Sequence, residues 1–219
     1  MKVLLALLFL LPTVTYARQQ GYPVFQTLRM HTYDVNYGTA FNFYWRHKRY
    51  LVSNWHVCRN FHHTSAKNQL TGKTYYSNVI ASFPTEDLCL LTPVGKGGIE
   101  VSQEAVQAGY PVYTGGYPAH HDKKLVLRAG KTTRMSNAKL DYGRGPCPSG
   151  FEKGSGTCER KFVVQDTTLI GEKGCSGSPV VNSKAQLVGI VNQENNGTVS
   201  YLLVSRLVRI LKLLEPISH

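Results

Sequence analysis

The most informative stretch of this sequence is Gly174-Cys175-Ser176-Gly177-Ser178-Pro179. Glycine has no side chain, so glycines on both sides of the serine let the backbone turn tightly and expose the hydroxyl. The same turn leaves the N–H groups of Gly174 and Ser176 free to point at one spot, as the stabilisation of an oxyanion requires. A plain turn between two strands uses the same small residues. Taken alone, the segment therefore predicts either a reactive serine or a β-turn.

Two other segments supply the partners that a reactive serine needs. The β-type run Leu51-Val52-Ser53 leads into His56, and Asp87 stands directly before the apolar run at residues 88–91. A hydroxyl is a poor nucleophile unless an imidazole takes its proton, and the imidazole needs a carboxylate that fixes its tautomer. His56, Asp87 and Ser176 are therefore the candidate catalytic set, in that order along the chain.

Each candidate has alternatives. Three further aspartates lie between His56 and Ser176, but none of them leads directly into an apolar strand; they are Asp122, Asp141 and Asp166. Glu86 is the close alternative to Asp87. Cys175 is the alternative nucleophile, but the frame Gly-x-nucleophile-Gly fits Ser176, whereas Cys175 would need glycines at positions 173 and 176.

In this order the motifs resemble the trypsin-like serine peptidases of the PA clan, and among them the glutamyl-endopeptidase and HtrA-type catalytic domains. The similarity rests on residues 38–41, 52–57, 87–91, 174–179 and 187–190. It implies two antiparallel β-barrels with the active site in the cleft between them. It also implies that Ser176 is the nucleophile, His56 the general base and acid, and Asp87 the orienting carboxylate. The oxyanion hole would be the N–H groups of Gly174 and Ser176.

The resemblance also indicates a substrate pocket. Counting back from Ser176, Ile170 and Gly171 would lie at its base, and Val191 and Asn192 on its wall. No acid stands at the base, although Glu172 is close by. We therefore expect preference for an uncharged, small to medium apolar residue before the scissile bond. Glutamate specificity is not expected, because Val191 stands where glutamyl endopeptidases carry a histidine.

The rest of the chain fits an all-β fold. Short β-type runs separated by turn residues extend from about residue 22 to 203, which is typical of a sandwich or of barrels. We expect one peptidase domain over residues 18–219, with an N-terminal barrel over about 22–98 and a C-terminal barrel over about 104–203. Apolar residues at 207, 210, 211 and 214 follow helical spacing and predict a C-terminal helix over about 205–215.

The N-terminus resembles a secretory signal peptide over residues 1–17. Lys2, an apolar run at residues 3–11 and a small-x-small site ending at Ala17 are its three parts. We therefore expect a secreted or periplasmic protein, in a compartment that permits disulfides.

The chain has five cysteines. Cys147 and Cys158 bracket a Gly/Ser-rich loop, so we expect them to pair and to stabilise the fold by about 2–3 kcal/mol. The pairing of Cys58, Cys89 and Cys175 stays open.

Composition narrows the function classes. The 219 residues carry a formal net charge of +12, and 42% of them are hydrophobic, which is ordinary for a folded protein. No apolar run reaches the roughly 18 residues of a membrane-spanning helix.

The basic surface is expected to attract acidic surfaces. The aromatic residues form no stacking motif for nucleic acid, so we expect no nucleic-acid partner. Histidine and cysteine spacings match no standard zinc site, so we expect no metal and no cofactor.

Together these patterns predict a secreted, monomeric serine endopeptidase that hydrolyses protein or peptide substrates through an acyl-enzyme. The alternative is a catalytically inactive protease-fold binding module, with a basic surface for anionic polymers. The complete set of His56, Asp87 and Ser176 favours the enzyme.

Overall fold

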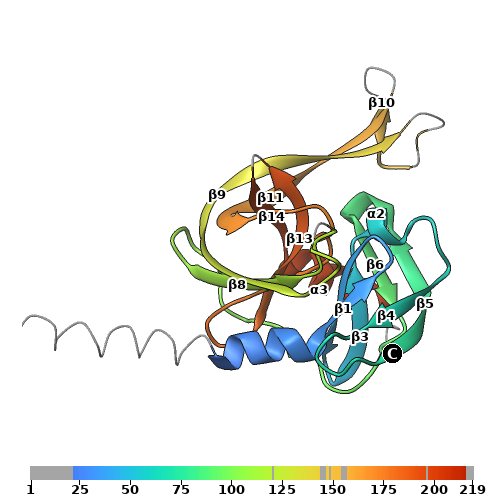
Figure 1. Ribbon diagram of the computed structural model, residues 1–219. Helices are drawn as coiled ribbons and strands as arrows, with labels where there is room; N and C mark the ends of the chain where they lie inside the picture. The colour runs from blue at the N-terminus through green and yellow to red at the C-terminus, as the bar shows by residue number, and fades with distance from the viewer. Residues whose placement is uncertain are drawn as a thin grey trace, which may run out of the picture.

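The computed structural model describes residues 22–119, 121–143, 147, 149–153, 157–195 and 197–215, so the expected signal peptide at residues 1–17 lies outside the described residues. Figure 1 shows two barrels side by side, the first coloured blue to green and the second yellow-green to red. The all-β, two-barrel fold expected from the sequence is confirmed.

The first barrel is a closed ring of six antiparallel strands. They are β1 (Thr32–Val35), β2 (Gly38–Trp45), β3 (Lys48–Ser53), β4 (His63–Lys67), β5 (Thr74–Phe83) and β6 (Leu88–Leu91). Their order is β1-β4-β5-β6-β3-β2, and pairing between β1 and β2 closes the ring. The short strand β7 (Ile99–Glu100) adds to β2 in the parallel direction. Two short elements interrupt the ring, α2 (Trp55–Cys58) after β3 and the 3-10 helix η1 (Pro84–Glu86) before β6.

The second barrel repeats this design. Its strands are β8 (Pro111–Gly116), β9 (Val126–Gly143), β11 (Cys158–Ile170), β12 (Pro179–Val181), β13 (Leu187–Asn195) and β14 (Thr198–Leu203). Their order is β11-β14-β13-β12-β8-β9, and pairing between β9 and β11 closes the ring. The two-residue strand β10 (Glu152–Lys153) pairs with the start of β11. Closure leaves the ring strands without unpaired edges, which protects an all-β chain from edge-to-edge association.

The predicted C-terminal helix is confirmed as α3 (Val204–Leu214). Its buried residues Leu207, Ile210 and Leu211 share one face, as the spacing in the sequence predicts, whereas the fourth residue of that spacing, Leu214, is 49% exposed. They join an apolar cluster that includes Phe41 and Leu90 of the first barrel. The helix therefore packs where the two barrels meet.

The N-terminal end of the described chain differs from the expectation. Residues 22–31 form a helix and not part of the β-type run expected from residue 22. Val24 and Leu28, four residues apart, are buried in the same apolar cluster. A helix is favoured because this spacing buries both side chains on one face.

A long hairpin of β9 and β11 extends beyond the second barrel, with β10 near its tip (Figure 1). Tyr142, near the end of β9, and Phe151 pack against the first barrel. The Trp55 ring of α2 stacks on Tyr142, with ring centroids 5.2 Å apart, and Phe151 joins them. The hairpin thereby braces the helix that carries His56. Among the described residues, no helix is long and apolar enough to cross a membrane.

Candidate active site

His56 and Asp87 are brought into contact by the first barrel. His56 lies on α2, directly after β3, and Asp87 lies between η1 and β6. The imidazole Nδ1 is 2.8 Å from Asp87 Oδ2 and 3.0 Å from Oδ1, and the His56 backbone N–H donates to Oδ1 at 2.9 Å. Because the carboxylate accepts the Nδ1 proton, the other ring nitrogen, Nε2, is left as a proton acceptor.

Contacts with the helix α3 distinguish the two adjacent acids, Glu86 and Asp87. Glu86 pairs with Arg206 at 2.9 Å and with Arg209 at 3.0 Å, so its carboxylate is engaged at the surface of this helix. Asp87 adopts a left-handed backbone conformation, with φ of 50°, which turns the chain between η1 and β6. Of the two acids, Asp87 is therefore the one that contacts the imidazole.

Asp87 is completely buried, so its charge depends on the donors around it. Besides the two donors of His56, the side-chain amide of Asn192 donates to Asp87 Oδ2. Asn192 lies on β13 of the second barrel and is itself only 3% exposed. The sequence placed Asn192 on a substrate-pocket wall. The structure shows that its side chain also joins the two barrels at the carboxylate.

The loop that carries Ser176 is fixed by hydrogen bonds from both barrels. Thr39 of β2 donates its N–H to the Ser176 carbonyl at 2.9 Å and its hydroxyl to the Gly174 carbonyl at 3.0 Å. Val191 of β13 accepts from the Gly177 N–H at 2.9 Å. Thr39 was part of a sequence motif but had no predicted role. Its contact with this loop joins residues far apart in the sequence and so has no local signal.

Two glycines of the loop are required by its geometry. Gly174 and Gly177 have φ of +95° and +83°, a region that residues with a side chain rarely adopt. A Cβ on Gly174 would lie 2.6 Å from the Tyr117 carbonyl oxygen, and a Cβ on Gly177 would collide with the Thr39 carbonyl oxygen. The resulting turn leaves the N–H groups of Gly174 and Ser176 without an acceptor among the described residues.

A groove of about 410 Å³ brings the candidate residues together. Its walls include His56, Ser176 and Asn192, together with the charged residues Arg59, Asp141, Glu172 and Lys173. Within it the Ser176 hydroxyl donates to the backbone carbonyl of Asn192 at 3.3 Å. The serine and the imidazole therefore line the same groove. In this structure the serine hydroxyl donates its hydrogen bond to the backbone of β13.

The four residues predicted for the substrate pocket do not lie together. Ile170 is 62% exposed at the end of β11, and Val191 is buried in the core of the second barrel. The N–H of Gly171 donates to the Gly197 carbonyl near the turn that precedes β14. Of the four residues predicted for the pocket, only Asn192 lines the groove.

Glu172 lines the groove but is not a free acid. Arg128 of β9 pairs with one carboxylate oxygen, and His121 Nε2 lies 3.0 Å from the other. Arg128 also donates to the Ile170 carbonyl. The side chain of Arg128 therefore offsets the charge of Glu172 and fixes the chain just before the serine loop.

Four of the five cysteines form two disulfides. Cys147 pairs with Cys158, as predicted, and Cys58 pairs with Cys89. The second bridge joins α2 to β6, two residues beyond His56 and two beyond Asp87. Cys175 is a free, buried thiol, and burial raises its pKa to about 11. Such a thiol is protonated at neutral pH and is a poor nucleophile, which agrees with the choice of Ser176 over Cys175.

Known proteins provide independent comparisons. The model of the family described as trypsin-like peptidase domain matches residues 38–190. The active form of the Rv3671c protease from M. tuberculosis superposes with a TM-score of 0.70 at 17% identity, covering 90% of this chain and 87% of that chain. An HtrA-type protease, AlgW with a decapeptide, superposes with a TM-score of 0.61 at 15% identity, covering 80% of this chain and 50% of that one. A comparison with curated proteins gave no match.

At these identities the solved structures establish similarity of fold, and the family model covers the His56 and Ser176 motifs together with most of both barrels. The chain therefore belongs to the trypsin-like peptidase family.

Proposed function

We propose that this protein is a serine endopeptidase that hydrolyses peptide bonds through an acyl-enzyme, with His56, Asp87 and Ser176 as its triad. The observation that carries the proposal is the convergence of His56, paired with the buried Asp87, and Ser176 on one groove. A turn that requires glycine and leaves two N–H groups without acceptors beside that hydroxyl adds to it.

The reaction follows from the roles of these groups. The Ser176 hydroxyl turns from the Asn192 carbonyl to His56 Nε2, gives up its proton and bonds to the carbonyl carbon of the substrate. The N–H groups of Gly174 and Ser176 stabilise the oxyanion, and loss of one such donor costs roughly 100- to 1,000-fold in rate in comparable enzymes. The protonated imidazole then gives its proton to the leaving amine as the C–N bond breaks. Water, activated by the same imidazole, hydrolyses the acyl-enzyme.

The groove supports an uncharged residue before the scissile bond. Glu172 is the acid that could attract a lysine or arginine side chain, but the Arg128 guanidinium already pairs with it. A further basic side chain would have to compete with Arg128. We therefore propose a preference for small to medium apolar residues at this position, to be measured with a peptide library.

We propose that the enzyme acts after export, because residues 1–17 have the three parts of a signal peptide. Expression in a secreting host with N-terminal sequencing of the product tests this, and a mature chain that keeps Met1 would refute it.

A fluorophosphonate probe tests the enzymatic proposal, because it reacts with activated serines. The wild type is expected to be labelled, and Ser176→Ala is expected to lose labelling while its circular dichroism stays unchanged. Cys175→Ala is the matched control at the neighbouring position and should keep its labelling. A folded wild-type protein that is not labelled would favour the alternative, an inactive binding module with a basic surface.

A further inference from the structure

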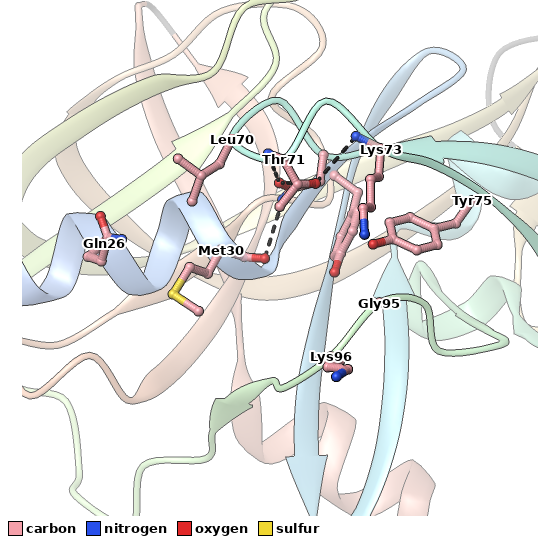
Figure 2. Close-up of a pocket in the computed structure, with 10 residues that line it drawn as sticks. Gln26, Met30, Leu70, Thr71, Lys73, Tyr75, Gly95 and Lys96 are labelled. Atoms are coloured by element: carbon pink, nitrogen blue, oxygen red, sulfur yellow. Dashed lines mark hydrogen bonds between the residues drawn. The ribbon is translucent and has the colours of Figure 1, made fainter.

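A second cavity lies on the first barrel, and it shares no lining residue with the active-site groove. It has a volume of about 660 Å³ and lies between the helix at residues 22–31, the turn that joins β4 to β5, and the loop at Gly95 and Lys96 (Figure 2). Ligand sites for small molecules have volumes of about 300–1,000 Å³. The cavity is therefore large enough for a small molecule.

One buried side chain holds its walls together. Asn68, at 1% exposure, donates its amide to the backbone carbonyls of Arg29 and Met30 near the end of the helix, and to that of Thr32 at the start of β1. Its side-chain oxygen accepts from the N–H of Thr71 at 3.0 Å. The turn is thereby fixed against the helix, so a ligand would meet walls that are already in place.

The cavity has an apolar side and a cationic side. Met30 and Leu70 are 46% and 49% exposed, although both are large and apolar. Figure 2 shows them on one side, with Lys73 and Tyr75 on the other and Lys96 below. Exposed apolar side chains that line a cavity mark it as a place for an apolar group.

The cationic side lacks counter-charges. No acidic residue lines the cavity. Across the part of the chain that the structure describes, neither Lys73 nor Lys96 forms an ion pair, and the Tyr75 hydroxyl has no hydrogen-bond partner. Two ammonium groups and a phenol are donors suited to a carboxylate or a phosphate.

We propose that this cavity binds a small amphiphilic anion, with its hydrocarbon part against Met30 and Leu70 and its carboxylate or phosphate at Lys73, Tyr75 and Lys96. The inference goes beyond the proposed peptidase activity and does not rest on it, because the two sites share no residue.

Calorimetric titration of the purified protein tests the proposal, with all ligands kept below their micellar concentrations. The probes are decanoate, decyl phosphate, decanol, acetate and inorganic phosphate. At least one decyl anion should bind, and decanol should bind about tenfold more weakly or worse, because it lacks the charge-assisted hydrogen bonds. The better of the two decyl anions identifies the head group. Binding of neither decyl anion, or equal binding of decanol, would overturn the proposal.

Variants place the binding in this cavity. The double variant Lys73→Gln, Lys96→Gln should weaken the decyl anion about tenfold or more while leaving decanol unchanged. The control Lys131→Gln, Lys161→Gln makes the same charge change at exposed residues of the second barrel and should bind as the wild type does. Equal affinity of the first variant and the wild type would refute the assignment, as would equal weakening by the control. Fluorophosphonate labelling should be the same in all three proteins.

Discussion

Replacement of Asn192 by alanine is the sharpest test of how the two barrels cooperate at the site. The change removes the side-chain amide that donates to Asp87 Oδ2. It leaves the backbone carbonyl that accepts the Ser176 hydroxyl. The buried Asp87 carboxylate keeps two other donors, the backbone N–H and the Nδ1–H of His56. The variant therefore removes one of three hydrogen bonds to the carboxylate and leaves its contact with His56 in place.

The magnitude follows from the kind of bond that is lost. A hydrogen bond to a charged group contributes about 1.5–3 kcal/mol, and a buried acceptor cannot replace it with bulk water. If Asp87 turns to recover a partner, it moves the imidazole with it. We therefore expect kcat/KM to fall about 10- to 150-fold. The free energy of unfolding should fall by about 1–3 kcal/mol.

The assay combines peptide kinetics, the rate of fluorophosphonate labelling and denaturation in urea. Gln193→Ala is the matched control, because Gln193 is the next residue on β13 and lines the same groove without a hydrogen bond to Asp87. Asn192→Asp should be worse than Asn192→Ala, because it adds a like charge beside a buried carboxylate. The reasoning would be refuted if folded Asn192→Ala labelled at the wild-type rate, or if Gln193→Ala lost as much activity.

Three further changes probe the loop and the cysteines. Gly177→Ala should abolish labelling and lower the free energy of unfolding by more than about 2 kcal/mol. The control Gly197→Ala has a similar φ but open space around the added Cβ, so it should lower the free energy of unfolding by only about 1–2 kcal/mol. Equal losses of stability in urea denaturation would contradict the predicted collision with Thr39. Replacing Cys58 and Cys89 together by alanine should cost about 3–4 kcal/mol of stability and slow labelling, and an unchanged labelling rate would show that the bridge does not position His56. Cys175 should resist iodoacetamide at pH 8 and react only as the pH approaches its pKa of about 11, and rapid alkylation at pH 8, seen by mass spectrometry, would contradict its burial.

The turn at Ser176 and the helix α3 could be predicted from the sequence because each depends on residues close together in the chain. The turn at Ser176 needs glycines at fixed positions, and the apolar face of α3 needs a fixed spacing, so both leave a pattern in the sequence. The helix at residues 22–31 differs from the β-type expectation because the segment is short, and because the burial of Val24 and Leu28 depends on residues of both barrels that lie far away in the sequence.

Contacts between segments that are distant in the sequence could not be predicted from local residue spacing. Thr39 and Ser176 are far apart in the chain, and the hydrogen bond between them exists only because β2 lies against the serine loop. The substrate-pocket prediction depended on counting residues, and it could not register that the side chain of Val191 points into the core.

By itself, the sequence determined the all-β class, the C-terminal helix and the Cys147–Cys158 bridge, because periodicity and turn chemistry specify them. The two barrels followed from the resemblance of its ordered motifs to the trypsin-like peptidases. Only the tertiary structure decided that Asp87 and not Glu86 contacts His56, that Cys58 pairs with Cys89, and that Asn192 donates to the carboxylate. These are choices between neighbouring or chemically equivalent groups. They are made when barrel closure and α3 bring particular atoms within hydrogen-bond distance, which a one-dimensional pattern does not encode.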